Sequence, residues 1–412
     1  MFDEYGARRC FMVEDTGVVP QGNSLSGKSV LLGITGGIAA TEAVRLSREL
    51  RRHGAEITVI MTTAATKVIT PLAIQWATQG PVITDWDSEM SQLKEFDAVL
   101  IAPATRNFLA RYSCGMMDHP LLMACSAARG RSSPIIVVPS MHADLFDDPV
   151  TNDILSRITE TEIILGPYEE GRFKQPSPVQ IVAELCHVVN SSEDSKDVVV
   201  TLGATKTPID SVRVVQNTST GATGWRISEY LYRHGFNVTV VAGETKAEPT
   251  FTLPNVIQRS HPDDMLAACM ELAKNSVPPD CWIYTAAILD YCTTPLSGKK
   301  SSSSGKSWDI ELFAGKKHIQ ELAKFNAGAI RIGFKLESIE GHEYSESSAL
   351  ENLHSKAIEQ IEKYGVDATI GNILEHLADP NLPRGYLITN SDMITLEDIA
   401  QMCQEITRIL AP

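Results

Sequence analysis

The stretch SVLLGITGGIAATEAVRLSREL, Ser29–Leu50, decides the fold: an apolar run passes through a glycine-rich turn into a helical pattern. The turn is not the G-x-x-x-x-G-K-[ST] phosphate loop, because no Lys-Ser or Lys-Thr follows Gly37. It is not G-x-G-x-x-G either, since Gly33, Gly36 and Gly37 have the wrong spacing. A turn of small residues before a helix still lets backbone N–H groups approach an anion. The turn therefore predicts either a phosphate cradle or a tight strand-to-helix connection without a ligand.

Length and composition narrow the class of protein. The chain has 412 residues, enough for two or three domains, and 43% of them are hydrophobic. A formal net charge of −15 argues against a general binder of nucleic acid or of membrane surfaces. Its eight cysteines include no C-x-x-C pair, which disfavours a zinc site or a disulfide framework. With no apolar run of 18 residues, we expect a cytoplasmic protein without a membrane partner.

Strand and helix patterns alternate along the chain and restart once. The polar segment Val189–Asp197 separates two series of alternating strands and helices. A typical apolar strand of the first series is DAVLIAPAT, and the second series begins with the strand DVVVTLGAT. Alternation of this kind implies parallel strands joined by crossover helices. We predict an α/β protein of two Rossmann-like, doubly wound domains, with an irregular N-terminal extension. The predicted ranges are 1–27 for the extension, 28–190 for the first domain and 191–412 for the second.

The loops that follow the strands are the candidate ligand-binding segments. In open α/β sheets, ligands bind beyond the carboxyl ends of the strands. The segments expected there are rich in hydroxyls, amides and small residues, which favours a phosphorylated cofactor. They read GITGG, MTTAATK, APATRN and PSMHADLF in the first domain, and TLGATKTPIDSVRVVQNTSTGATG, VAGET, AAILDY and GFKLES in the second.

These loops, in this order, resemble a known family from about Ser29 to the C-terminus. The family is the bifunctional coenzyme A biosynthesis protein, a phosphopantothenoylcysteine decarboxylase fused to a phosphopantothenate–cysteine ligase. PSMH, PYEEGRFK and GFKLES look more like its archaeal branch than its bacterial one. The motifs of the decarboxylase half are ITGGIAA, VIMTTAATKVITPLAI, APATRN and PSMH; those of the ligase half are LGATKTPIDSVRVVQNTSTG, AAILDY, GFKLES and DATIGN.

For the first domain, the resemblance implies a flavodoxin-like, FMN-binding flavoprotein fold that forms homo-oligomers, either trimers or dodecamers. In the family, FMN oxidises the cysteinyl thiol, carbon dioxide leaves, and the flavin returns its hydride to yield 4'-phosphopantetheine. The implied FMN contacts are Gly36, Gly37 and Ile38 at the phosphate, Thr62 and Thr63 near the flavin, Ala104, Thr105 and Asn107 in the loop facing flavin and substrate, and Met141.

For the second domain, the resemblance implies CTP-dependent ligation of cysteine to 4'-phosphopantothenate, with Mg²⁺ as the metal. The family's ligase makes an acyl-cytidylate, which the amine of cysteine then attacks. Asn372 is expected to orient a loop or the nucleotide. The other implied residues are Asn217 beside the acyl centre, Asp290 at the metal or nucleotide, Lys299 or Lys300 at the phosphates, and Phe334 and Lys335 at the base and ribose.

The chain departs from the family pattern in both halves. The decarboxylase histidine that precedes the P-A-T loop is missing from WDSEMSQLKEFD, where Ser88, Glu89 or Met90 takes its place. His142 either acts as acid, base or substrate clamp, or only forms hydrogen bonds in its loop. In the ligase half, Ala222 stands where the family has a phosphate-facing lysine. The residue expected to compensate is Lys206, Arg213 or Arg226.

These departures leave two alternatives beside the bifunctional enzyme. One is a flavoprotein of the same architecture that acts on another phosphorylated or thiol substrate. The other is a non-catalytic subunit that binds flavin or nucleotide and pairs with an active paralogue. The absent histidine favours the alternatives, whereas the intact ligand loops and Asp290 favour an enzyme.

Overall fold

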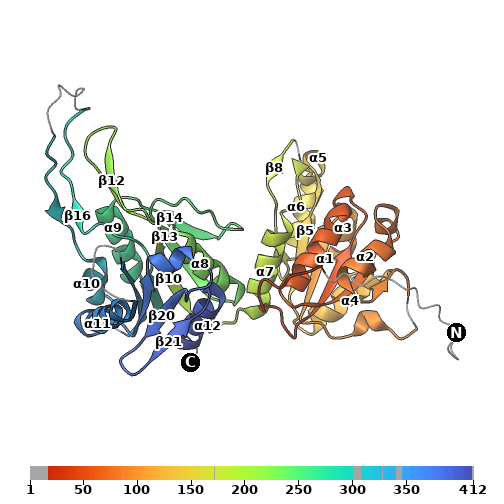
Figure 1. Cartoon of the computed structure of the whole chain (residues 1–412). Coiled ribbons are helices and arrows are strands. Elements are labelled where there is room, and N and C mark those ends of the chain that lie inside the picture. Colours follow the sequence, from red (N-terminus) through yellow and green to blue (C-terminus); the bar gives the residue numbers. More distant parts are fainter. Residues whose placement is uncertain are drawn as a thin grey trace. The chain divides into compact units, whose positions relative to one another are not determined.

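The computed structural model describes residues 17–86, 88–170, 172–299, 308–326, 328–339 and 346–410. The chain divides into two compact units, Met1–Asn190 and Ser191–Pro412. Each unit holds one large twisted sheet with helices on both faces (Figure 1). The predicted α/β class is confirmed. In the described residues, no helix is long and apolar enough to cross a membrane.

The sheet of the first unit is parallel throughout. The chain moves outward from its first strand in one direction and then returns to that strand's other side. This reversal creates a topological switch point between β1 and β4, where open α/β sheets bind their ligands. In spatial order the strands are β3 (Val82–Ile83), β2 (Glu56–Met61), β1 (Ser29–Ile34), β4 (Ala98–Ala104), β5 (Ile135–Pro139) and β7 (Glu162–Ile163).

Helices cover both faces of this sheet because each presents an apolar stripe to it. Leu46 and Leu50, four residues apart on α1, are fully buried against one face. Burial of each such leucine stabilises the unit by about 2 kcal/mol. One face is covered by α1 (Ala43–Arg52), α2 (Pro71–Thr78) and α7 (Pro178–Asn190), and the other by α3 (Arg106–Ser113), α4 (Pro120–Gly130) and α6 (Pro149–Ser156).

Shorter elements complete the first unit. A small antiparallel sheet lies beyond β5 and continues into a four-residue helix. Single 3₁₀ turns follow several strands. The bounds are β6 (Met141–His142), β8 (Tyr168–Glu169), β9 (Arg172–Phe173), α5 (Ala143–Phe146), η1 (Ile38–Glu42), η2 (Ala65–Lys67) and η3 (Ser91–Leu93).

The described residues that precede β1 pack onto the first unit without forming helix or strand. The N–H groups of Gln21 and Leu25 donate to the carbonyls of Arg52 and His53, which satisfies acceptors at the end of α1. The side chain of Leu25 is fully buried. Leu25 therefore ties this segment to the core of the unit.

The sheet of the second unit is parallel in its first six strands and antiparallel in its last two. Its switch point lies between β10 and β15, the counterpart of β1 and β4. In spatial order the strands are β14 (Asn255–Gln258), β13 (Asn237–Ala242), β10 (Asp197–Leu202), β15 (Cys281–Tyr284), β18 (Ile330–Glu337), β19 (Ala368–Ile373), β20 (Gly385–Ile388) and β21 (Met393–Leu396).

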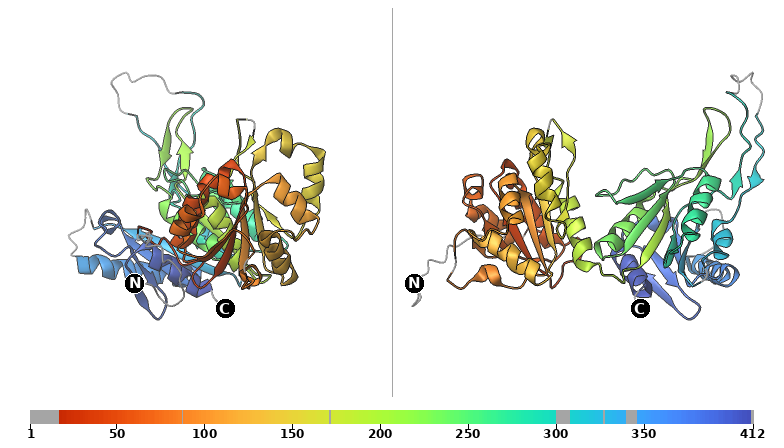
Figure 2. Two further views of the ribbon diagram at one scale, coloured as in Figure 1. Left: turned by 90° about the vertical axis from the view of Figure 1, so that its right-hand side faces the viewer. Right: turned by 180° about the vertical axis from the view of Figure 1, so that it is seen from behind.

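Helices again cover both faces, and two antiparallel arms extend away from this sheet (Figures 1 and 2). The face on one side carries α8 (Ala222–Arg233) and α12 (Ile399–Leu410). The opposite face carries α9 (Pro262–Ala273), α10 (His318–Ala323) and α11 (Glu346–Tyr364). The arms contain β11 (Lys206–Pro208) with β12 (Val214–Gln216), and β16 (Tyr291–Cys292) with β17 (Phe313–Ala314); η4 (Glu375–Ala378) follows β19.

Candidate functional sites

The loops after β1 and β4 meet at the switch point of the first unit. The hydroxyl of Thr35 donates to the carbonyl of Pro103 at 2.7 Å, and it accepts from the N–H of Thr105 at 2.9 Å. The Thr105 hydroxyl in turn accepts from the N–H of Phe108, which caps the start of α3. One hydroxyl thus joins the glycine turn to the APATRN loop.

Gly36 brings the loop after β2 into the same site. A Cβ at Gly36 would lie 2.2 Å from the Cβ of Ala64, so only glycine lets these two loops pack together. A Cβ at Gly37 would lie 3.5 Å from a methyl group of Thr105, which is ordinary contact. Packing of the two loops alone therefore explains why residue 36 is a glycine. A side chain at residue 37 would fit, so the glycine at that position leaves space beside Thr105 that a ligand can fill.

The other residues expected at the flavin lie at the same edge of the sheet. They follow the carboxyl ends of β2, β4 and β5, so the fold brings the predicted set together. The Thr62 hydroxyl accepts from the N–H of Ala65 at 3.2 Å. Ile38 has 75% of its side chain exposed, a large apolar surface beside the turn. Thr63 and Asn107 are also exposed, whereas Ala104 and Met141 are buried.

His142 stands at the start of α5 and is exposed. Its Nδ1 accepts from the N–H of Asp144 at 3.4 Å and lies 3.1 Å from a carboxylate oxygen of the same residue. Its backbone pairs with β9 in the segment PYEEGRFK, where Phe173 packs against Phe146 and Tyr168. His142 is thus a helix cap with an accessible ring, which fits both interpretations of this residue.

In the described part of the segment that lacks the histidine, none of the three residues at its expected place is buried. Ser88 and Glu89 are exposed, and Met90 has a left-handed backbone with φ of 53°. Gln92 and Phe96 are buried in this segment, and the Nε2 of Gln92 lies 3.4 Å from the sulfur of Met90. Among these residues, Glu89 and Ser88 are the ones that carry exchangeable protons or hydroxyls at the surface.

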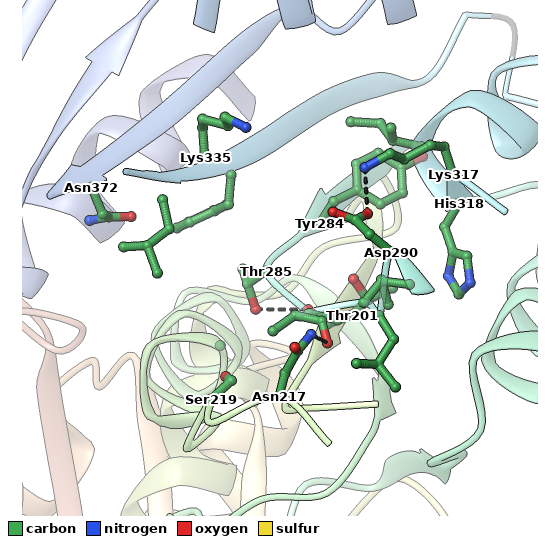
Figure 3. A pocket seen from close by; sticks show the side chains of 18 of the residues that line it. Thr201, Asn217, Ser219, Tyr284, Thr285, Asp290, Lys317, His318, Lys335 and Asn372 are labelled. Carbon is green, nitrogen blue, oxygen red and sulfur yellow. Dashed lines mark hydrogen bonds and ion pairs between the residues drawn. The ribbon is translucent and has the colours of Figure 1, made fainter. Parts of the chain in front are cut away.

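A pocket of about 1190 Å³ opens at the switch point of the second unit (Figure 3). Four of the residues predicted for the ligase, Asn217, Asp290, Phe334 and Lys335, line it, although they come from different loops and strands. Asn372 lines it as well. The remaining walls include the hydroxyl-bearing residues Thr201, Ser219, Thr220, Thr223, Tyr284 and Thr285.

The loop Asn217–Gly221 is fixed by tight packing. Asn217 donates through Nδ2 to the carbonyl of Ala287 at 3.0 Å, which ties the loop to the segment after β15. Gly221 has φ of 78°, and a Cβ there would lie 2.6 Å from a methyl group of Thr245. The loop leads directly into α8, where the N–H of Ala222 donates to the hydroxyl of Thr220 at 3.4 Å, and the start of the helix adds favourable partial charge for an anion.

Five lysines line the pocket in the described part of the chain, and each lies within 4.0 Å of a carboxylate. Lys317 pairs with Asp290 at 2.5 Å, as Figure 3 shows. The other pairs are Lys316 with Asp263 at 3.1 Å, Lys335 with Glu337 at 3.3 Å, Lys356 with Glu337 at 2.5 Å, and Lys363 with Glu359 at 3.9 Å. The pocket is therefore rich in cations that are already neutralised.

Of the two lysines predicted for the phosphates, Lys299 lies in the described residues, and it is not at the pocket. Lys299 is exposed and does not line it, and Lys300 lies outside the described residues. Lys316 and Lys317 occupy the pocket instead. The N–H of Gly315 donates to the carbonyl of Asp290 at 2.8 Å, so strand pairing brings the two lysines beside the aspartate. No local pattern in the sequence indicates that pairing.

None of the three residues expected to compensate for Ala222 lines the pocket. Lys206 pairs with Glu244, and Arg213 pairs with Asp210 and faces the ring of Trp308. Arg226 lies 3.7 Å from Glu229. Their charges are thus placed elsewhere in the unit.

For two further side chains of the pocket, the structure defines the hydrogen bonding or the charge. Asn372 donates to the carbonyl of Arg384 at 2.6 Å, a contact that fits the expected role of orienting a loop or the nucleotide. His318 is 7% exposed, and burial lowers its pKa to about 4, so its ring is neutral at pH 7. His318 lines the pocket as an uncharged side chain.

Asp290 fits the way in which proteins bind Mg²⁺ with a nucleotide. In the described residues no three His, Cys, Asp or Glu side chains form a metal cage. Mg²⁺ usually keeps several waters and needs only one or two carboxylates together with substrate phosphates. One carboxylate facing a large pocket that also carries hydroxyl groups and lysines meets that requirement.

Two family models match the chain, one on each unit. The model described as Flavoprotein matches residues 19–190. The model described as DNA/pantothenate metabolism flavoprotein C-terminal domain matches residues 194–374. Together they cover most of the chain, in the order that the sequence motifs imply.

The most informative relative is a coenzyme A biosynthesis bifunctional protein, CoaBC, from Thermococcus kodakarensis. It is 32% identical over 361 residues, which span 85% of this chain and 86% of the relative. The chain belongs to this family. The CoaBC protein of Methanocaldococcus jannaschii is 28% identical over 376 residues, spanning 90% of this chain and 89% of that protein. Membership confirms the expected role in coenzyme A biosynthesis, with a ligase and a decarboxylase in one chain.

A solved structure also resembles part of the chain. The DNA/pantothenate metabolism flavoprotein from Streptococcus pneumoniae shares 21% identity, with a TM-score of 0.46. The match covers 52% of this chain and 98% of that one.

Proposed function

We propose that the second unit joins cysteine to 4'-phosphopantothenate at the expense of CTP, and that the first unit decarboxylates the product with FMN to give 4'-phosphopantetheine. Both reactions then take place in the cytoplasm. The observation that carries the proposal is the pocket at the second switch point, where Asn217, Asp290 and Lys335 converge from separate loops. The same edge of the first sheet gathers the glycine turn and the APATRN loop.

In the ligase pocket, each residue has a role that its contacts support. Asn217 is anchored through one N–H to Ala287, which leaves its carbonyl oxygen and second N–H for the acyl group of the substrate. Asp290 would hold Mg²⁺, which supplies charge neutralisation at the phosphates when it is bound. Lys317 is paired with Asp290 in this structure. When the carboxylate of Asp290 binds the metal, the ammonium group of Lys317 would be free to bind a phosphate oxygen instead. Phe334 and Lys335 are assigned to the base and ribose.

The first-unit site fits FMN through its shape and its hydrogen-bonding groups. The missing side chain at Gly37 leaves space beside Thr105, and hydroxyls of Thr62 and Thr63 lie on the neighbouring loop. Small residues and hydroxyls suit the phosphate and ribityl chain, and exposed Ile38 offers apolar surface. A bound FMN would supply the two-electron redox chemistry on which loss of carbon dioxide depends.

His142 is the proposed proton-exchanging group of the decarboxylase. Its ring is exposed beside the PYEEGRFK segment, and its position is fixed by the contact with Asp144. Glu89 lies in the segment where the family histidine is expected, on the molecular surface. The absence of that histidine favours a second candidate, a flavoprotein of this family whose first site acts on another thiol substrate.

Exposed apolar residues support the proposal that the chain forms a homo-oligomer. Val212 and Val214 lie on one arm of the second unit, and Leu312 and Phe313 on the other, each with 46% or more of its surface exposed. Large exposed side chains on extended arms are typical of subunit contacts. The proposed assembly is the trimer or dodecamer that the resemblance implies, with a paralogue as a further partner.

The test is to purify the full chain, record its visible spectrum, and supply phosphopantothenate, cysteine, CTP and Mg²⁺. We expect a yellow protein that releases pyrophosphate and carbon dioxide. A colourless protein that FMN fails to reconstitute contradicts the first-unit assignment. Pyrophosphate without carbon dioxide supports the altered flavoprotein, and the absence of both products rejects the proposal. Replacing CTP by ATP in the same assay identifies the nucleotide.

A further inference from the structure

Arg384 differs from every lysine that lines the ligase pocket. In the described residues the five lysines of the pocket are each paired with a carboxylate, whereas no carboxylate lies within 4.0 Å of the guanidinium of Arg384. Its side chain is half-buried, and burial lowers its pKa. A cation that is partly removed from water and has no anion beside it is costly to maintain. Among the described residues of the pocket, Arg384 is therefore a basic group that no carboxylate of the protein neutralises.

The position of Arg384 is fixed from two sides. Its Nη2 donates to the hydroxyl of Thr223 at 2.9 Å, in the first turn of α8. Its backbone carbonyl accepts from Asn372 at 2.6 Å, and Asn372 is only 8% exposed. At the next residue, Gly385, a Cβ would lie 2.7 Å from the same Asn372 nitrogen. The guanidinium is thus held against the wall that also carries Ser219 and Thr220.

We propose that Arg384 binds a phosphoryl group of a substrate in this pocket, at the wall formed by Thr223 and the Asn217–Gly221 loop. One N–H of the guanidinium is used by Thr223, and the others can form paired hydrogen bonds to phosphate oxygens. This inference rests on the proposed function, because CTP and phosphopantothenate both carry phosphate. Arg384 lies beyond residue 374, where the match to the family model ends.

The test measures binding to the full-length protein by calorimetry, with CTP, phosphopantothenate and inorganic tripolyphosphate as separate probes. We expect Arg384→Gln to weaken binding about tenfold or more, because a charge-assisted pair of hydrogen bonds is lost. The matched control is Arg226→Gln, on the helix α8 that carries Thr223 but outside the pocket, and it should bind as wild type. Arg384→Lys keeps the charge and should keep part of the affinity.

A double variant moves the positive charge from residue 384 to residue 222. Ala222 lines the pocket next to Thr223, so Ala222→Lys combined with Arg384→Gln should regain most of the lost affinity. A weakened affinity for CTP alone assigns the phosphoryl group to the nucleotide, and a weakened affinity for phosphopantothenate alone assigns it to that substrate. Unchanged binding of all three probes by a folded Arg384→Gln protein overturns the proposal.

The probes also separate this inference from the proposed function. If the wild type binds neither CTP nor phosphopantothenate, the proposed function fails. In that case, weaker binding of tripolyphosphate by Arg384→Gln still supports the phosphoryl site, and equal binding rejects it. Thermal unfolding of each variant without ligand shows whether the fold is retained, and Arg384→Lys serves as the test if Arg384→Gln does not fold.

Discussion

The two units use the same topological position for their sites but build them from different groups. At the first switch point, between β1 and β4, the site consists of a glycine turn, threonine hydroxyls and backbone. At the second, between β10 and β15, ionic side chains from at least four elements surround a large pocket. The difference matches the chemistry proposed for each: one site holds a resident cofactor, and the other must bind and release highly charged substrates.

The two sites also differ in what must change when a ligand binds. In the first site, hydrogen bonds between loops fix the geometry without using charge. In the second, the lysines are already paired with carboxylates, so ligand binding must exchange one ion pair for another. Such exchange costs little, because exposed pairs contribute only up to about 1 kcal/mol each. The first site is preorganised by packing, and the second by its network of charges.

The largest expected effect is on flavin content. Gly36→Ala places a Cβ 2.2 Å from that of Ala64, which forces the loops after β1 and β2 apart. We expect purified Gly36→Ala protein to lose its bound flavin, as read from the visible absorbance per chain. Gly130→Ala is the matched control, since a Cβ there meets nothing within 4 Å. Full flavin content in Gly36→Ala would show that these loops do not form the site.

The second largest expected effect is a loss of ligase activity in Asp290→Asn, with no change in the first unit. Asp290→Asn removes the proposed metal-binding carboxylate, and we expect kcat/KM for pyrophosphate release to fall roughly 100-fold. Flavin content should not change, because the substitution lies in the other unit. Asp263→Asn is the control: it also pairs with a lysine of the pocket but does not line the pocket itself. Equal activity of the two variants would remove Asp290 from the mechanism.

A comparable loss is expected in the decarboxylase when His142 is changed to asparagine. Asparagine also caps helices well, so α5 should keep its start. Without an imidazole to exchange protons, carbon dioxide release should fall roughly 100-fold. The measurement is the rate of carbon dioxide release from phosphopantothenoylcysteine, with flavin content as the control. An unchanged rate would leave His142 with only its capping role.

The smallest effect is on pH-dependent stability. His318 is neutral in the folded chain, with its pKa lowered by burial from 6.5 to about 4, whereas its unfolded counterpart takes up a proton below pH 6.5. Stability is therefore complete above pH 6.5 and falls as the pH drops toward 4, by about 3 kcal/mol in all.

The check is thermal unfolding of the wild type and His318→Asn between pH 7 and pH 4. The melting temperature of the wild type should fall more steeply than that of the variant over this range. His354→Asn, at an exposed position, should follow the wild type. Parallel curves for the wild type and His318→Asn would show that this ring does not contribute to the pH dependence.

The sequence predicts the parts of both sites that depend on local structure. The glycine turn directly follows β1, and Asn217 and Asp290 lie in the connections that come after β10 and β15. The carboxyl ends of these parallel strands must share one edge of the sheet. The sequence does not predict Lys317 or Arg384. Lys317 reaches the pocket through the pairing of β16 with β17 across a long connection, and Arg384 through the turn between β19 and β20. Their places depend on tertiary packing, for which the chain carries no local pattern.

The central claim is that the two units carry separate reactions. The most direct test supplies phosphopantothenoylcysteine, the product of the first reaction, to the wild type and to Asp290→Asn, and measures carbon dioxide release. The two proteins should decarboxylate it at the same rate, although Asp290→Asn no longer releases pyrophosphate from CTP. A decarboxylation rate that falls together with the ligase rate would contradict the assignment of one reaction to each unit.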